Sequence, residues 1–262
     1  MPESSSSTPE AREPRSPRSI LWSYLSEDIR EDMLLETELL VLTFATGIQD
    51  AAAWPDYACF ASNQTGNTLF LFIGAAGLTK HSYSIPNIAS SLLMFVLGAL
   101  VLGQMGNWIG VRKRLWLLIS NVVQTVLIYL ALAVQNMGPV KRDGRSAIVV
   151  VGLMAFSSGG QVAMARSLKI TEITTAAATA AIIDVCVDPQ LAKLRNRLRN
   201  RRVLFLIMLA AGCCVGVFVQ KKVGSRIPML LCGGLKAVVC FAFLINRAMI
   251  LEPEVMTGDL KV

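Results

Sequence analysis

Eight long apolar segments, separated by short polar stretches, constrain the fold of this chain more than any other feature. They lie at 37–54, 57–78, 85–110, 115–137, 147–165, 170–187, 203–219 and 227–246. Each is about 17–26 residues long, close to the ~20 residues that a helix needs to cross the ~30 Å hydrocarbon core of a bilayer. The segments therefore predict an all-α, polytopic transmembrane helix bundle of about eight spans, within a range of six to eight.

Composition excludes several classes of protein. Of the 262 residues only 16% are charged, whereas soluble domains carry about 25%. Six cysteines, one histidine and no Cys-x-x-Cys pair argue against the common zinc frameworks, so we expect no metal and no cofactor. The net charge of +7 does not indicate a nucleic-acid partner, because the Lys and Arg residues lie between the apolar segments. The usual hydrolase and metalloprotease motifs are absent, so we do not expect an enzyme.

The two ends of the chain differ from its apolar part. Residues 1–34 are rich in Ser, Pro, Glu and Arg and are predicted to form a disordered cytoplasmic tail. Within this tail, 20–34 places apolar residues on one helix face, which fits either an interfacial helix or an acidic linker. No cleavable signal peptide is expected. The transmembrane domain is predicted at 35–248, followed by a C-terminal tail at 249–262.

The basic residues of the loops predict the orientation. With the N-terminus in the cytoplasm and eight spans, the inside loops, which include 138–146 and 188–202, hold 16 Lys and Arg residues. The outside loops, which include 112–114, hold 8. Because Lys and Arg are enriched in cytoplasmic loops, an integral, multi-pass protein with both termini in the cytoplasm is predicted. The densest cluster, Lys193–Arg202, is expected to bind anionic lipid headgroups.

The two halves of the chain share a layout. Gly47-Ile48-Gln49 precedes Thr65 in the first half, and Gly159-Gly160-Gln161 precedes Thr175 in the second. A G-x-x-x-G pair, which lets helix backbones approach closely, follows in each half. The four glycines predicted to pack helices are Gly106, Gly110, Gly212 and Gly216. We predict two four-helix repeats, 37–137 and 147–246, in parallel orientation about an axis along the membrane normal.

These motifs, with the stretch from Cys59 to Asn67 and the basic run Arg199–Arg202, resemble the YoaK-type family of membrane proteins (domain of unknown function 1275), in particular its fungal-like branch. The resemblance covers roughly 35–248. It implies an integral membrane protein of unestablished activity, for which transport is a common suggestion. Two positions depart from the family pattern: Thr174 replaces a usual Pro, and Asn63 stands where Met is expected. Without that Pro, the sixth span would be straighter than a broken helix.

Polar residues inside the predicted spans are the candidate site, because ionisable groups within a membrane are costly and commonly functional. Asp50, which lies before the expected end of the first span at Trp54-Pro55, fits either a cation, proton or substrate site or a structural cap of backbone N–H groups. The polar stretch Asn63–Asn67 fits either a broken helix or a helix contact. The candidate substrate or ion site comprises Asp50, Gln49, Asn63, Thr65, Asn67, Gln161, Glu172, Thr175 and Thr179.

One further charge lies inside a span. Lys236 is ten residues into the last segment, and if buried it needs either a carboxylate partner or a depressed pKa. We consider three carboxylates as that partner: Asp50, Glu38 and Asp184.

Together these features favour a small-solute transporter in which polar residues of spans one, two, five and six line a site. The alternative is a non-transporting scaffold or lipid-interacting protein whose polar stripes are helix-packing contacts. The expected partners are the lipid bilayer and a small molecule or ion, and association of copies of the chain is left open.

Overall fold

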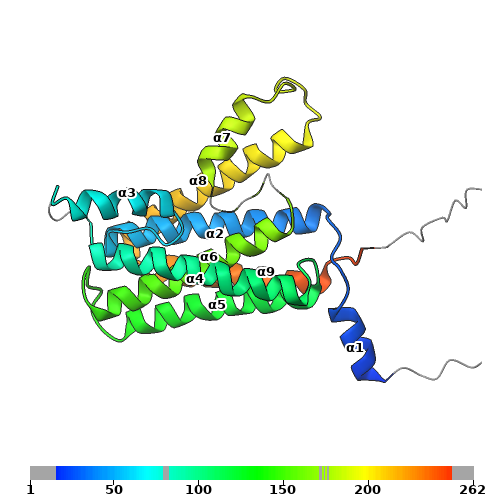
Figure 1. The fold of residues 1–262 in the computed structure, drawn as a ribbon, viewed down its shortest axis with the longest axis horizontal. Helices are drawn as coiled ribbons and strands as arrows, with labels where there is room; N and C mark the ends of the chain where they lie inside the picture. The colour runs from blue at the N-terminus through cyan, green and yellow to red at the C-terminus, as the bar shows by residue number, and fades with distance from the viewer. Residues whose placement is uncertain (1–15, 79–82, 171–172, 174, 176, 250–262) are drawn as a thin grey trace, which may run out of the picture.

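The computed structural model describes residues 16–78, 83–170, 173, 175 and 177–249 (Figure 1). The predicted tails before 16 and after 249 lie outside this range, as does Glu172. The described chain is all-helical apart from two isolated backbone bridges. Its helices are α1 (Pro17–Leu25), α2 (Met33–Tyr57), α3 (Gln64–Ala75), α4 (Ile85–Ile109), α5 (Arg114–Asn136), α6 (Arg145–Ser167), α7 (Ala178–Cys186), α8 (Arg197–Val223) and α9 (Arg226–Ile245).

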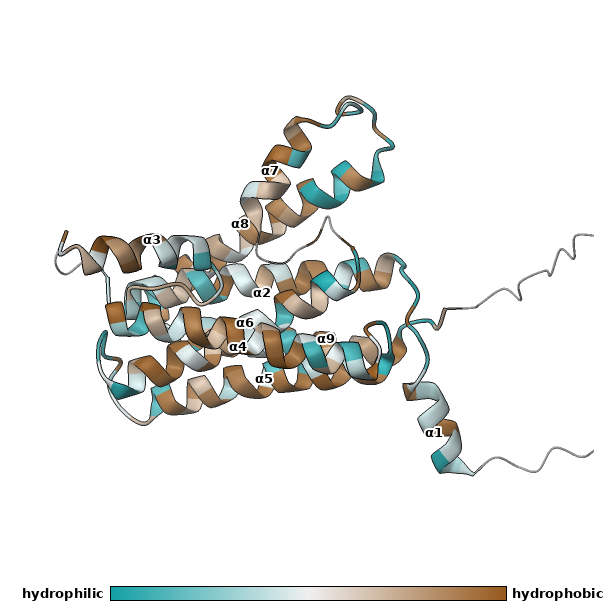
Figure 2. Cartoon of the chain, viewed as in Figure 1, coloured by the Kyte–Doolittle hydropathy of each residue, from teal (hydrophilic) through white to brown (hydrophobic). Residues whose placement is uncertain are grey.

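Five helices are long and apolar enough to cross a membrane: α4, α5, α6, α8 and α9. The helix α2 is as long as α4, at 25 residues each, and lies among them (Figure 1). Apolar residues follow the long helices while polar residues gather in the loops and at many helix ends (Figure 2). The expected helical, multi-pass integral membrane protein is thus confirmed.

The predicted second and sixth spans differ from this pattern. Within 57–78 the helix α3 has only 12 residues, and within 170–187 the helix α7 has only 9. At 1.5 Å per residue these helices are about 18 Å and 14 Å long, too short to cross the ~30 Å hydrocarbon core. Neither segment therefore forms a continuous spanning helix.

The helix α2 is longer than the expected first span. Asp32 caps its start, since its carboxylate accepts hydrogen bonds from the N–H groups of Leu34 and Leu35. The helix continues through Pro55, where we expected it to end, and stops at Tyr57. A proline this close to the C-terminus removes only one helical hydrogen bond. Ala58, in the left-handed conformation with φ of 50°, ends the helix.

After α2 the chain folds back along the helix that it has just left. The N–H groups of Ala61 and Ser62 bind the side chain of Asp50, which lies seven residues before the end of α2. The helix α3 therefore begins roughly 10 Å inside that end. The side chain of Asn87, in the first turn of α4, donates to the carbonyl of Tyr57, so α4 starts where α2 stopped. Ala58, which follows α2, and Ser84, which precedes α4, thus lie at the same end of the bundle.

The loops gather at two ends of the bundle. At the first end, Ile29 bonds to Arg112 and pairs with Ala248, and Arg112 also binds the carbonyl of Leu168. Both termini of the described chain are therefore at this end (Figure 1). The expected helix at 20–34 is present only as far as Leu25.

At the second end, Ser84 donates to Asp143, the side chain of Gln135 donates to Ser225, and Arg226 donates to the carbonyl of Gly138. This arrangement corrects the predicted sidedness. The stretch 112–114 lies with the N-terminal segment, and 138–146 lies opposite, because α3 does not cross the bundle. Each half then has three helices that run from one end of the bundle to the other. Because three is an odd number, the second half begins at the end opposite to that at which the first half begins. As a result α2 and α6 run in opposite directions, unlike the predicted parallel repeats.

Close helix contacts occur where α8 crosses α2 and where α4 crosses α6. A Cβ atom on Gly212 of α8 would lie 2.1 Å from the carbonyl oxygen of Phe44 in α2, so only glycine permits this approach. Gly216 likewise lies against Ile48. The other predicted pair is placed differently: Gly106 lies against the ring of Trp116 in α5, and Gly110 is the residue after α4, with φ of 117°.

Candidate functional site

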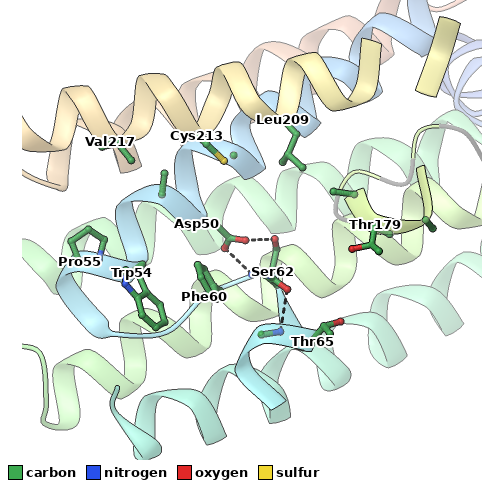
Figure 3. A pocket seen from close by; sticks show the side chains of 17 residues that line it. Asp50, Trp54, Pro55, Phe60, Ser62, Thr65, Thr179, Leu209, Cys213 and Val217 are labelled. Atoms are coloured by element: carbon green, nitrogen blue, oxygen red, sulfur yellow. Dashed lines mark hydrogen bonds between the residues drawn. The ribbon is translucent and has the colours of Figure 1, made fainter. Parts of the chain in front are cut away.

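A cavity of about 820 Å³ lies between α2, α8 and the starts of α3 and α7 (Figure 3). Ligand sites typically measure about 300–1,000 Å³. Five polar residues line it, namely Asp50, Ser62, Asn63, Thr65 and Thr179. The other twelve lining residues are Gly47, Ala51, Trp54, Pro55, Phe60, Gly66, Ala177, Ala178, Ala180, Leu209, Cys213 and Val217.

Asp50 is the centre of this site. One carboxylate oxygen accepts hydrogen bonds from the N–H groups of Ala61 and Ser62, each at 2.8 Å. The other accepts the hydroxyl of Ser62 at 2.5 Å. The side chain thus fastens the loop before α3, as a structural cap would. It also lines the cavity and is only partly buried, so both interpretations of this aspartate have a geometric basis.

Three other candidate residues lie at the edge of the cavity. Asn63, Thr65 and Thr179 line it and are all exposed. Asn63 accepts a hydrogen bond from the N–H group of Gly66 and so caps α3. The structure therefore brings Asp50, Asn63, Thr65 and Thr179 to one cavity.

Gln49 and Gln161 lie in the bundle interior instead, where they join α2 to α6. The amide of Gln49 donates to the hydroxyl of Ser158 at 2.8 Å. The amide of Gln161 donates to the hydroxyl of Thr46, also at 2.8 Å. Both glutamines are buried and neither lines the cavity.

Asn67 and Thr175 are also buried away from the cavity. The side chain of Asn67 accepts the N–H group of Phe60 at 2.9 Å and donates to its carbonyl at 2.7 Å, so it holds the loop that precedes α3. Thr175 has a φ of 60°, and its hydroxyl has no hydrogen-bond partner among the described residues. Glu172 lies outside them.

The ammonium of Lys236 is 1% exposed and donates to the side-chain oxygens of Gln124 and Gln161. None of the three carboxylates considered from the sequence is its partner in the described chain. Glu38 accepts the amide of Asn246 at 2.7 Å, and Asp184 lies 3.5 Å from Arg202. A charge surrounded by neutral amides replaces the expected ion pair.

Sequence reasoning missed several cavity residues. Ser62 lies in a loop, where no periodicity signals a role. Trp54 and Phe60 stack with their ring centroids 4.8 Å apart, but aromatic residues are common in apolar segments and carry no distinct signal. Cys213 follows Gly212 in the apolar sequence of α8, where the pattern does not distinguish it from other small apolar residues. Over the described ranges, no group of three His, Cys, Asp or Glu side chains is placed to hold a metal ion.

Comparison with known proteins places the chain in a family. A family model described as "Protein of unknown function (DUF1275)" matches residues 39–242, which include all seventeen residues that line the cavity. No curated protein and no solved structure matches the chain.

Proposed function

The chain belongs to the DUF1275 family of proteins of unknown function, and we propose that it is a small-solute transporter whose solute site is the cavity beside Asp50. The observation that carries this proposal is a cavity of ligand size, in a helical membrane protein, with a carboxylate at its centre. Because carboxylates inside membrane helices are costly, they commonly mark the path of a substrate or ion. A finer placement among YoaK-type proteins of a fungal-like branch, and a role without enzymatic activity, are part of the proposal.

The two short helices support this function. Both α3 and α7 begin at the cavity, where Thr65 and Thr179 lie in their first turns. Interrupted helices inside a membrane are tolerated where the irregular backbone is buried in protein or lines a cavity. Transporters commonly build their binding sites from such segments.

An inverted repeat, with α2–α5 related to α6–α9, is also part of the proposal. The contacts between helices are retained when the two halves are exchanged, since α2 packs on α8 as α6 packs on α4. The glutamine contacts are reciprocal: Gln49 donates to Ser158, three residues before Gln161, and Gln161 donates to Thr46, three residues before Gln49. Repeats of opposite direction are a common architecture of secondary transporters, whose substrate sites lie between the halves.

Basic residues support a cytoplasmic location for the first end. Fourteen described Lys and Arg residues lie on this side: Arg18, Arg30, Arg112, Lys113, Arg114, Arg166, Lys169, Lys193, Arg195, Arg197, Arg199, Arg201, Arg202 and Arg247. The second end has six, namely Lys141, Arg142, Arg145, Lys221, Lys222 and Arg226. This excess favours both termini in the cytoplasm.

Anionic lipid headgroups remain proposed partners of the Lys193–Arg202 segment. The structure narrows the residues that are suited to this role. Arg197 and Arg201 both form ion pairs with Glu36, whereas Lys193 and Arg195 are exposed. We therefore assign headgroup binding mainly to Lys193 and Arg195.

The alternative function, a scaffold or lipid-interacting protein without transport, is favoured by one observation. Gln49 and Gln161 use their polar groups to join helices, as polar residues in packing contacts do. In that case the cavity beside Asp50 would hold lipid.

Flux into proteoliposomes tests the proposal. We expect the purified protein to move at least one solute from a panel of cations, anions and neutral metabolites. Asp50→Asn should reduce this flux because it removes the charge at the cavity. The matched control is Asp56→Asn, which changes a carboxylate of the same helix that does not line the cavity and that binds Gln220 at 2.9 Å. Absence of flux across the panel, or equal effects of the two variants, would reject transport through this site.

A further inference from the structure

The charge of the cavity comes from one side chain. Among the seventeen residues that line it, Asp50 is the single charged one. The groups that donate to it, which include the N–H groups of Ala61 and Ser62 and the hydroxyl of Ser62, are neutral backbone and hydroxyl groups. None of these donors carries a charge, so none can neutralise the carboxylate when it is ionised. An ionised Asp50 therefore gives the cavity a negative charge that no lysine or arginine of the described lining neutralises.

The N-terminus of α7 does not reverse the negative sign of the charge in the cavity. Ala178 and Thr179 line the cavity, and the start of α7 has no side-chain cap, so its N–H groups contribute positive potential. A helix terminus is equivalent to about half an elementary charge, and this effect falls off within the first turn. The full charge of Asp50 outweighs it. The start of α3 is already capped by Asn63.

An aromatic wall lies next to the carboxylate. Trp54 and Phe60 line the cavity and stack with their ring centroids 4.8 Å apart and their planes at 21°. The faces of aromatic rings attract cations, and this attraction increases where water is excluded. Figure 3 shows Trp54 and Phe60 on the same side of the cavity as the loop that binds Asp50.

The opposite wall is apolar. Leu209, Cys213 and Val217 of α8 face the cavity with Ala51 of α2. These side chains offer no strong hydrogen-bonding group, so a sugar or a multiply charged metabolite would lose its hydration there without compensation. The walls suit a solute that has one charged group and an apolar body.

We infer that the cavity beside Asp50 takes a small organic cation, a protonated amine with an apolar body. The ammonium group lies near the carboxylate of Asp50 and beside the stacked pair of Trp54 and Phe60, and the apolar body lies against α8. This inference rests on the proposed function, because it assigns the substrate class of the same site.

A native cysteine in the cavity wall provides the test. Cys213 is partly buried on α8 and lines the same cavity as Asp50 (Figure 3). The full-length protein is prepared with the five other cysteines changed to alanine. Its thiol is then reacted with a cationic reagent, 2-aminoethyl methanethiosulfonate, and with an anionic one, 2-sulfonatoethyl methanethiosulfonate. Rates are divided by those of the same reagents with a small free thiol.

The cationic reagent should react at least about tenfold faster than the anionic one, because opposite effects of one nearby charge act on the two reagents. Asp50→Asn should bring the two rates close together, and Asp50→Glu should restore the difference. Ser62→Ala is the control, since it removes a hydrogen bond from the loop but keeps the charge. Phenethylamine should protect Cys213 from reaction, whereas phenylacetate, with a similar apolar body and opposite charge, should not.

Equal rates, a faster anionic reagent, or protection by phenylacetate would overturn the inference. Failure of both reagents to react with folded protein, when they react after denaturation, would also overturn it and would indicate a cavity filled by lipid. Charge-selective labelling in a protein that transports nothing would keep the inference and reject the proposed transport. Transport of anions that Asp50→Asn changes and Asp56→Asn does not, together with equal labelling rates, would keep the proposed transport and reject the inference.

Discussion

Replacement of Gly212 by alanine is the sharpest test of the contact between α2 and α8. The added Cβ atom would lie 2.1 Å from the carbonyl oxygen of Phe44, 3.0 Å from its carbonyl carbon and 3.1 Å from its Cα atom. Carbon atoms in good contact are about 3.5–4.0 Å apart, so the two helices must separate by roughly 1 Å. Because both partners are helix backbone, no side-chain rotation relieves the clash. Overpacking of this kind costs about 1–3 kcal/mol.

The assay is thermal unfolding of the purified protein in detergent. About 1 kcal/mol shifts Tm by about 2–4 °C in a domain of this size, so the Tm of Gly212→Ala should lie about 2–12 °C below that of a glycine-to-alanine change with the same helix propensity and no clash. Gly234→Ala is the matched control: it lies in α9, and a Cβ atom there meets nothing within 4 Å. Both changes gain about the same helix propensity, near 1 kcal/mol, so their difference reports packing. A Tm of Gly212→Ala equal to or above that of Gly234→Ala would refute the reasoning.

Three further predictions follow from other parts of the structure. Asn67→Leu should lower Tm by about 2–12 °C in the same assay, because it leaves the N–H group of Phe60 without its partner, at a cost of about 1–3 kcal/mol, and its carbonyl with the hydroxyl of Ser91 alone; an unchanged Tm would show that this side chain does not hold the loop. Arg201→Met should destabilise the protein by about 1–3 kcal/mol in chemical unfolding, since it removes the ion pair with Glu31 and leaves Glu36 with Arg197 alone; a stabilised variant would contradict the ion-pair account. Single cysteines at Lys113 and Lys141 should be labelled by a membrane-impermeant reagent from opposite sides, with Lys113 on the side of the N-terminus; labelling of Lys141 from that side would contradict the fold-back of the segment 58–84.

The long helices could be predicted from the sequence because a run of about twenty apolar residues has few alternatives to a membrane span. The shortness of α3 could not. Its segment is apolar over the full length of a span, but its helix begins only after Ala61 and Ser62 have folded back to Asp50. Ala61 and Ser62 are eleven and twelve positions from Asp50 in the sequence, and the local sequence pattern does not indicate that they contact it.

The sequence does not reveal this contact, and for that reason the predicted orientation of the two halves was wrong: parallel halves were predicted, and the structure has opposite ones. A segment that spans the bundle and a segment that folds back to the same end have similar compositions. Each loop that follows, however, lies at one end of the bundle in the first case and at the other end in the second. The hydrogen bonds of the two glutamines show that α2 and α6 run in opposite directions, because Gln49 donates to Ser158 and Gln161 donates to Thr46. These contacts exist only in the folded structure.

The site was predictable in part. Asp50 stood out because a carboxylate among apolar residues is rare. Its neighbour Gln49 seemed equally suitable, but adjacent residues of a helix point about 100° apart, so Gln49 faces α6 while Asp50 faces the cavity. The partners of Lys236 were not predictable, because glutamine carries no charge pattern that would single out Gln124 and Gln161.

Modification of Cys213 during transport tests the central claim, that the cavity beside Asp50 is the path of the solute. Flux is measured in proteoliposomes with the protein whose one remaining cysteine is Cys213, before and after reaction with 2-aminoethyl methanethiosulfonate. The added group occupies the cavity between Asp50 and α8, so flux should fall in proportion to the fraction of protein modified. Unchanged flux through protein in which Cys213 is fully modified would contradict the account.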